Sequence, residues 1–71
     1  MNDRERIEQL FHAEAARVRA YAMHRVGANH ADDMVAETFA VAWRRMDKVP
    51  DDERPWLLAV ARRVIANHLR G

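Results

Sequence analysis

The chain has 71 residues, no cysteine and a formal net charge of +1 at pH 7. It contains no apolar run approaching the roughly 18 residues of a membrane-spanning helix, and its first residues, MNDRERIEQL, do not resemble a basic and then apolar leader. These features predict a soluble, cytoplasmic chain that forms a single small domain over residues 1–71, with no membrane partner. Without disulfides, its stability must come from packing of secondary structure.

The near-neutral total hides an uneven distribution of charge. Residues 1–30 carry a net charge of +1, residues 31–53 a net charge of −4 and residues 54–71 a net charge of +4. This asymmetry indicates two different partners, or one partner with an electrically divided surface. The alternative is that the acidic middle and the basic end neutralise each other within the fold.

The N-terminal third predicts one long helix. Asn2 and Glu5 have the spacing of a capping box, which places the helix start at Asp3, and Gly27 ends the helix near Val26. Apolar residues recur at steps of three and four and form one stripe. The stripe contains Ile7, Leu10, Phe11, Val18, Tyr21 and Ala22.

Two charged residues, Glu14 and Arg25, fall on this stripe rather than opposite it. A charge in such a position either extends its polar end to the surface or pairs with an opposite charge on a neighbouring helix. We therefore expect a structural role for both residues.

A second helix is predicted over residues 30–46. Asn29, followed three residues later by Asp32, is typical of a helix start, and Asp32 and Asp33 suit the positive end of the helix dipole. The apolar residues again form one stripe, with Trp43 at its margin. This stripe contains Ala31, Met34, Val35, Thr38, Phe39, Ala42 and Met46.

The opposite face of the second helix is polar and flat. Asp33, Glu37 and Arg44 share it with the small residues Ala36 and Ala40. Such a surface could dock a helix of a partner protein. It could also be an ordinary solvated face, which is the interpretation that the spacing alone favours.

A loop follows at Asp47 to Arg54, DKVPDDER. Pro50 disfavours helix at the residue before it, and either Asp51 or Asp52 can cap the helix that comes next.

The third helix, predicted over residues 54–70 with Pro55 in its first turn, carries the widest apolar face. On an ideal helix this face fills an arc of roughly 220°, which requires packing against at least two other helices. Arg62, Arg63 and Arg70 share the remaining strip, where a polyanion could bind or where the arginines simply solvate the helix. The apolar arc contains Trp56, Leu57, Leu58, Val60, Ala61, Val64, Ile65 and Leu69.

The sequence offers little for an enzyme. It has no Ser or Cys to act as a nucleophile and no Gly-rich phosphate loop. The four histidines do not form a metal-ligand motif, and we expect His68 to be a hydrogen-bonded core residue. We therefore expect no catalytic activity, no metal and no cofactor. The histidines are His12, His24, His30 and His68.

Two segments, ADDMVAETFAVAWRRM and PWLLAVARRVIANHLR, together resemble region 2 of bacterial extracytoplasmic-function (ECF) sigma factors, which direct RNA polymerase to promoters. In that family an acidic pair precedes Leu-Val-Gln-Glu-Thr-Phe and a Trp closes the helix. A later motif has a Trp-Leu pair, then Ile-Ala-Arg, then Asp or Asn before an aromatic residue or His and Leu-Arg. The residues that correspond here are Asp32, Asp33, Met34, Val35, Ala36, Glu37, Thr38, Phe39 and Trp43, and then Trp56, Leu57, Val60, Ala61, Arg62, Asn67, His68, Leu69 and Arg70.

The resemblance implies an all-α bundle of three main helices that acts in transcription initiation. Its second helix would bind the clamp helices, a coiled coil on the largest subunit of the RNA polymerase core. Its final loop and helix would open the promoter minus-ten element and hold the non-template single strand. The polymerase-binding candidates are Asp32, Asp33, Glu37 and Arg44, and the DNA-binding candidates are Lys48, Arg54, Trp56, Arg62, Arg63, Asn67 and Arg70.

Two residues depart from the family pattern. Ala36 replaces a common Gln, which removes a polar contact to polymerase, and Arg63 stands where Asn is usual, which bears on DNA backbone contact or promoter preference. The family's region 4, a helix-turn-helix that reads the minus-thirty-five element, does not occur in this sequence. We therefore expect a cut or natural fragment that does not read double-stranded promoter DNA.

An opened strand presents bases that need a pocket once they leave the stack. The polar loop Asp47 to Arg54, backed by Trp56, is the candidate for this pocket, although the position of Trp56 on the apolar arc also fits a core residue. The alternative function is a helical protein-interaction module that binds an anti-sigma protein or a second copy of itself, without DNA binding of its own.

Overall fold

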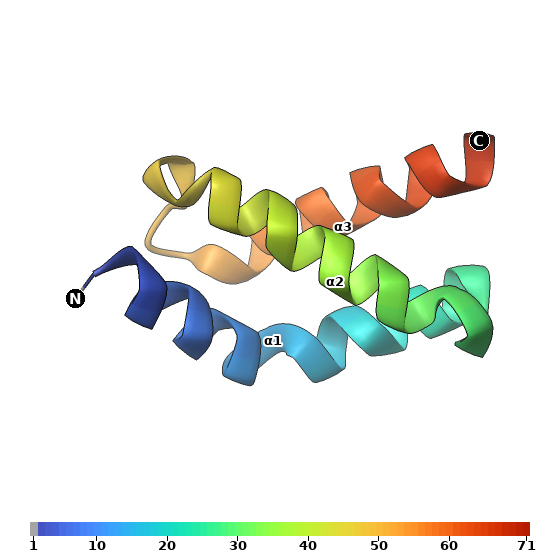
Figure 1. Ribbon diagram of the computed structural model, residues 1–71, viewed down its shortest axis with the longest axis horizontal. Coiled ribbons are helices and arrows are strands. Elements are labelled where there is room, and N and C mark those ends of the chain that lie inside the picture. The colour runs from blue at the N-terminus through green and yellow to red at the C-terminus, as the bar shows by residue number, and fades with distance from the viewer. Residues whose placement is uncertain (1) are drawn as a thin grey trace.

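The three amphipathic segments fold into three α-helices, which confirms the all-α prediction. The computed structural model describes residues 2–71 and contains α1 (Asp3–Val26), α2 (Ala28–Arg44), a short 3-10 helix η1 (Met46–Lys48) and α3 (Glu53–Arg70). Figure 1 shows α2 crossing α1, with α3 on the other side of α2 and the two chain ends at opposite ends of the bundle. The bundle measures 35 × 20 × 17 Å along its principal axes.

The ends of α1 are those that the sequence predicts. The backbone N–H of Glu5 donates to Asn2 Oδ1 at 2.8 Å, so Asn2 caps the helix as predicted, and Glu5 Oε1 accepts from the side-chain Nδ2 of Asn2 at 3.3 Å rather than from its backbone N–H. At the other end Gly27 has φ +80° and its N–H donates to the carbonyl of Met23. A residue with a side chain would be strained at this φ, which explains the glycine.

The start of α2 differs from the prediction. The helix begins at Ala28 rather than at residue 30, directly after Gly27, and no side chain caps it. Asn29 therefore lies inside the first turn and is not the cap, because the turn at Gly27 reverses the chain without a linker. The helix ends at Arg44, and its last predicted turn tightens into η1, which still buries Met46.

The start of α3 also lacks the predicted side-chain cap. Asp52 occupies the cap position but its carboxylate makes no capping hydrogen bond, and Pro55 lies in the first turn as predicted. The carboxylate of Glu53 instead receives a hydrogen bond from Arg6 of α1. This contact connects the start of α3 to α1, while the first N–H groups of α3 have no side-chain cap.

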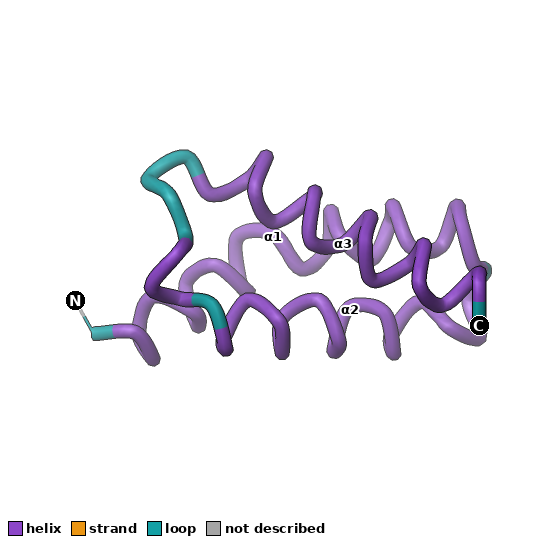
Figure 2. Tube along the Cα trace, turned by 90° about the horizontal axis from the view of Figure 1, so that it is seen from above, coloured by secondary structure: helices purple, strands orange, loops and turns teal. Residues whose placement is uncertain are grey.

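The core lies where the three helices meet, and Figure 2 shows them side by side with the loop at one end. α3 packs on both α1 and α2, as its wide apolar arc requires. Two apolar residues depart from the prediction, since Phe11 is 44% exposed and Leu69, in the last turn of α3, is 60% exposed. The core falls into two clusters, Leu10, Val18, Val35, Phe39, Ala42, Leu57 and Ala61 near the loop, and Ala22, Ala31, Met34 and Ile65 near the turn at Gly27.

The two charges on the α1 stripe have different environments. Glu14 is 7% exposed, and its carboxylate accepts hydrogen bonds from Arg54 Nε of α3 at 3.0 and 3.2 Å, which confirms the predicted pairing with a neighbouring helix. Arg25 is exposed, with its guanidinium carbon 5.2 Å from the centroid of the Tyr21 ring. None of the helices in residues 2–71 combines the length and apolar character that a membrane crossing requires.

Candidate interaction surfaces

The acidic residues of α2 divide between two sides of the helix. Asp33 and Glu37 are exposed with the small Ala36 between them, and Arg44 Nη2 lies 3.9 Å from Glu37 Oε1. Asp32 instead faces α1, because its Oδ1 accepts a hydrogen bond from Arg19 Nε at 2.8 Å. Three of the four polymerase-binding candidates therefore share one surface, and Asp32 lies beside it.

The arginine strip of α3 forms a basic exterior. Arg62, Arg63 and Arg70 are all exposed. Within residues 2–71 none of the three has a carboxylate oxygen within 4.0 Å, although acidic residues are abundant in the middle of the chain. Arg70 Nη2 donates to Oδ1 of Asn67, one turn earlier on the same helix. The positive charge of the C-terminal third is thus available to an external anion.

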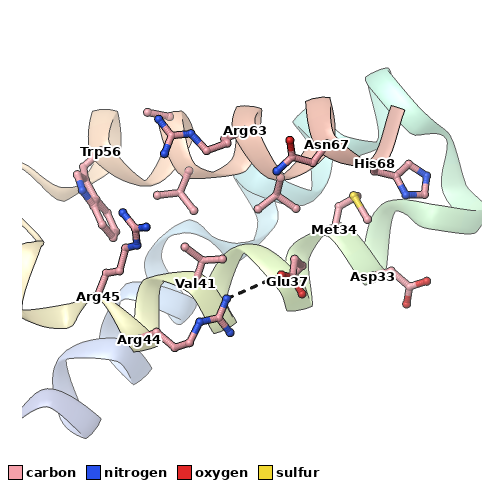
Figure 3. Close-up of a pocket in the computed structure, with 13 residues that line it drawn as sticks. Asp33, Met34, Glu37, Val41, Arg44, Arg45, Trp56, Arg63, Asn67 and His68 are labelled. Atoms are coloured by element: carbon pink, nitrogen blue, oxygen red, sulfur yellow. Dashed lines mark ion pairs between the residues drawn. The ribbon is translucent and has the colours of Figure 1, made fainter. Parts of the chain in front are cut away.

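A groove of about 900 Å³ separates the acidic face of α2 from part of this strip. Figure 3 shows α2 and α3 as its two walls, with Arg44 and Arg45 toward one end, near Trp56, and Asp33 near His68 at the other. Met34, Val41, Val60 and Val64 supply apolar surface, so the apolar arc of α3 is covered by α2 only in part. The groove is lined by Asp33, Met34, Glu37, Val41, Arg44, Arg45, Trp56, Ala59, Val60, Arg63, Val64, Asn67 and His68.

The loop between η1 and α3 is attached to α1 by one arginine. Arg6 Nη2 donates to the carbonyls of Val49 at 3.2 Å and Pro50 at 3.0 Å, and Arg6 Nε donates to Glu53 Oε2 at 2.9 Å. Val49 itself is buried. The loop therefore has a defined conformation in the free chain.

A second, smaller pocket of about 470 Å³ lies under this loop. Its lining is mostly acidic, so it favours a neutral or cationic group with hydrogen-bond donors over a phosphate. Trp56 does not line this pocket, since it packs against the core and faces the larger groove. The lining residues are Glu14, Asp51, Asp52, Glu53, Arg54 and Pro55.

The remaining DNA-binding candidates lie in different places. Lys48 is exposed in η1, Arg54 is held by Glu14 at the start of α3, and Asn67 is exposed at the far end of the same helix. The seven candidates therefore do not form one compact patch. They follow α3 along its length, from the loop to the C-terminus.

The histidines correct one expectation. His68 is exposed and is not a core residue, because it lies at the open end of the groove between α2 and α3. Its ring centroid lies 4.9 Å from that of His30, in the first turn of α2. Among the residues that the structure describes, no group of three or more His, Cys, Asp or Glu side chains could hold a metal ion.

Sequence reasoning did not identify Arg6 or the groove. Arg6, Leu10 and Glu14 follow one another at steps of four, so Arg6 lies beside the edge of the buried stripe, one turn before Leu10. This spacing is a signal that the sequence holds. The groove has no comparable signal, because it depends on how far α2 and α3 diverge.

A family comparison agrees with this architecture. A model of the family described as sigma-70 region 2 matches residues 10–71, which is most of the chain. The chain therefore belongs to the sigma-70 region 2 family, a family of transcription initiation factor domains that act with RNA polymerase at promoters rather than as enzymes. Comparisons with curated proteins and with solved structures give no significant match.

Proposed function

We propose that the chain is region 2 of an ECF sigma factor, the subclass whose motifs its sequence resembles. In this proposal the α2 face with Asp33, Glu37 and Arg44 docks on the clamp helices of the polymerase core. The loop and α3 then open the promoter minus-ten element and hold its non-template strand, in the cytoplasm where polymerase acts. The proposed DNA contacts are Lys48, Arg54, Trp56, Arg62, Arg63, Asn67 and Arg70, and Asp32 is assigned to the edge of the polymerase surface.

The observation that supports this proposal most strongly is the separation of charge on two neighbouring helices. The exposed carboxylates of α2 cannot attract a phosphate backbone, whereas the unpaired arginines of α3 can. A bundle that binds a basic segment of polymerase and an acidic strand at the same time needs this division. The two partners can then be bound on different sides of one groove.

The loop pocket fits the same proposal. A base that leaves the stack is neutral and presents amino groups and carbonyls, which carboxylates and an arginine can recognise. The acidic lining around Arg54 repels phosphates, so the backbone would follow α3 while a base enters the pocket. The chain is one small domain with few exposed aromatic side chains on which bases can stack, so we expect weak binding without polymerase.

The test is binding of a labelled single strand with a minus-ten sequence, with and without polymerase core. The proposal predicts a specific complex only when polymerase is present, because docking adds effective concentration to the weak DNA contacts. A strand of scrambled sequence serves as control. If no sequence-dependent complex forms under either condition, the proposed function is wrong.

The groove supports a second candidate function. Its apolar floor and charged rims could hold an amphipathic helix of a regulatory protein such as an anti-sigma factor, without any contact to DNA. In that case a peptide helix that fills the groove would bind the chain alone and would displace polymerase. A chain that binds the minus-ten strand only in the presence of polymerase argues for the first function.

A further inference from the structure

We propose that Arg6 and Glu14 of α1 are positioning residues that hold the loop and Arg54 in the conformation in which they meet DNA. This inference rests on the proposed function of the loop. It assigns a role in the DNA contact to a helix that carries none of the candidate site residues. The two residues lie one turn before and one turn after Leu10, on the side of α1 that faces the loop.

Arg6 fixes the middle of the loop through three hydrogen bonds. Its guanidinium, about a quarter exposed at 27%, binds the carbonyls of Val49 and Pro50 and the carboxylate of Glu53. Only an arginine offers several N–H donors in one rigid plane, so a lysine could make some of these contacts but not all of them. Two consecutive carbonyls held in this way leave the loop backbone little freedom.

Glu14 fixes the end of the loop through Arg54. Both carboxylate oxygens accept from Arg54 Nε, at 3.0 and 3.2 Å, and Oε1 also lies 3.3 Å from Nε of Arg17. The Nε atom is therefore occupied, and the two terminal nitrogens of Arg54 remain for another ligand, since the side chain is 52% exposed. Glu14 thus orients the guanidinium without covering it.

Because Arg6 and Glu14 have opposite charges, their substitution can distinguish positioning of the DNA-binding residues from a purely electrostatic effect on DNA binding. Replacing Glu14 by Met removes a negative charge from a surface near DNA, so electrostatics alone predicts tighter binding. Positioning predicts weaker binding, because Arg54 loses its orientation. Replacing Arg6 by Met removes a positive charge instead of a negative one. Positioning predicts that it too weakens DNA binding, because the loop loses its conformation.

Position 14 also separates positioning from stability. Glu14 is buried, so a Met of similar volume fits its site, and Arg54 is exposed enough to stay solvated without its partner. Because Arg54 does not become a buried unpaired charge, the usual cost of removing one partner of a buried pair does not apply, and we expect Glu14→Met to keep a stability close to that of wild type. If a fully stable Glu14→Met variant binds DNA more weakly, the cause is the lost orientation of Arg54 and not a loss of stability.

The chain offers a matched pair of controls on the same helix. Arg4 and Glu8 form an ion pair at 3.4 Å in which the side chains are 83% and 61% exposed, and neither touches the loop. Arg4→Met and Glu8→Met reproduce the two charge changes without disturbing the loop. We expect small effects of opposite sign from them, as electrostatics requires.

The experiment measures two quantities in the four Met variants of the full chain. The first is the amide hydrogen exchange, in the free chain, of Lys48 and Val49, whose N–H groups donate to the carbonyls of Arg45 and Met46, and of Trp56, the first amide of α3 with an intrahelical acceptor. The second is binding of the minus-ten single strand in the presence of polymerase core. Arg6→Met and Glu14→Met should each speed loop exchange severalfold, with protection in α2 unchanged, and weaken DNA binding by about tenfold. Circular dichroism verifies the fold of each variant.

The conservative variants extend the test if a Met variant does not fold. Glu14→Gln has the same charge as Glu14→Met but keeps one acceptor, and Arg6→Lys keeps the charge with fewer donors, so both should fall between wild type and the Met variants. The inference is overturned if Glu14→Met, or Glu14→Gln in its place, binds DNA as tightly as wild type or more tightly and its loop exchange is unchanged. If the wild-type complex itself does not bind the strand, the proposed function is wrong, and loop exchange alone then decides whether α1 holds the loop.

Discussion

The exposed faces of α2 and α3 belong to helices that share one core and one groove, but their charged side chains are paired to different extents. On α2, Glu37 lies near Arg44 and Asp32 lies near Arg19. Asp33, the third acidic residue of this helix, lies one turn before Glu37. On α3 the arginines of the strip have no carboxylate oxygen within 4.0 Å in the part of the chain that the structure describes. The charge of α3 is therefore less compensated within the fold, and under the proposed function contacts of α3 should depend more on salt.

The largest effect is expected when the core that both faces share is weakened. Leu57 is fully buried at the junction of the helices, and Leu57→Ala should cost roughly 2 to 5 kcal/mol, much of the stability of a domain of this size. Both binding activities should be lost together, with the loss of helix measured by thermal circular dichroism. Leu69→Ala on the same helix is the control, and because Leu69 is 60% exposed it should change stability by less than about 0.5 kcal/mol. If the Leu57 variant melted like the control, the core would be wrongly placed.

The next largest effect separates the two faces by charge reversal on α2. Glu37→Lys should weaken binding to polymerase core by about tenfold and leave the melting temperature nearly unchanged, because the residue is exposed and faces away from the core. Binding is measured by titration with labelled core enzyme, and Glu8→Lys on α1 is the control for net charge. An affinity equal to that of wild type would remove this face from the polymerase contact.

A smaller effect is expected from a single charge on the other face. Arg62→Ala should lower retention of the minus-ten strand severalfold and reduce the slope of log K against log salt by about 0.7, since one phosphate contact is lost. Polymerase docking should not change, because Arg62 lies outside both the groove and the α2 face. Arg25→Ala, at an exposed arginine of α1, is the control. Equal retention for Arg62→Ala and wild type would move the DNA contact elsewhere.

The smallest effect compares the two adjacent aspartates of α2. Asp33→Asn should weaken polymerase binding, whereas Asp32→Asn should weaken it less and lower stability by at most about 1 kcal/mol, because Asp32 lies at the edge of that surface and is engaged with Arg19. Titration and thermal melting of the two variants provide the comparison. A larger binding defect for Asp32→Asn would show that the polymerase surface extends toward α1.

The fold could be predicted from local patterns to a large extent. The N-cap at Asn2, the stop at Gly27 and the apolar stripe of α2 are all encoded within a few residues of where they act. The start of α2 was misplaced because two signals, Gly27 and Asn29, lay two residues apart, and the glycine determined the turn. Local sequence rules do not say which of two neighbouring signals, here a glycine and a capping residue, determines where a helix begins.

The candidate surfaces could be predicted less completely, because they depend on contacts between helices. The sequence indicates that Arg62 and Arg63 lie on a polar strip, but only the packing of α3 shows that no carboxylate reaches them. Similarly, Trp56 belongs to the apolar arc and yet faces a groove, because α2 does not cover that part of the arc. Helical periodicity predicts on which face of its helix a residue lies. It does not predict how closely a neighbouring helix packs against that face.

The most direct test of the two-faced account is a salt titration of the complex with polymerase core and the minus-ten strand, using the variant Arg62→Ala/Arg63→Ala/Arg70→Ala. The account predicts that this variant docks on polymerase like wild type, while its binding of the strand weakens and the salt slope falls by about 2, roughly 0.7 for each arginine. If polymerase docking and strand binding were lost in parallel, or if strand binding and its salt slope were unchanged, the division of partners between α2 and α3 would be contradicted.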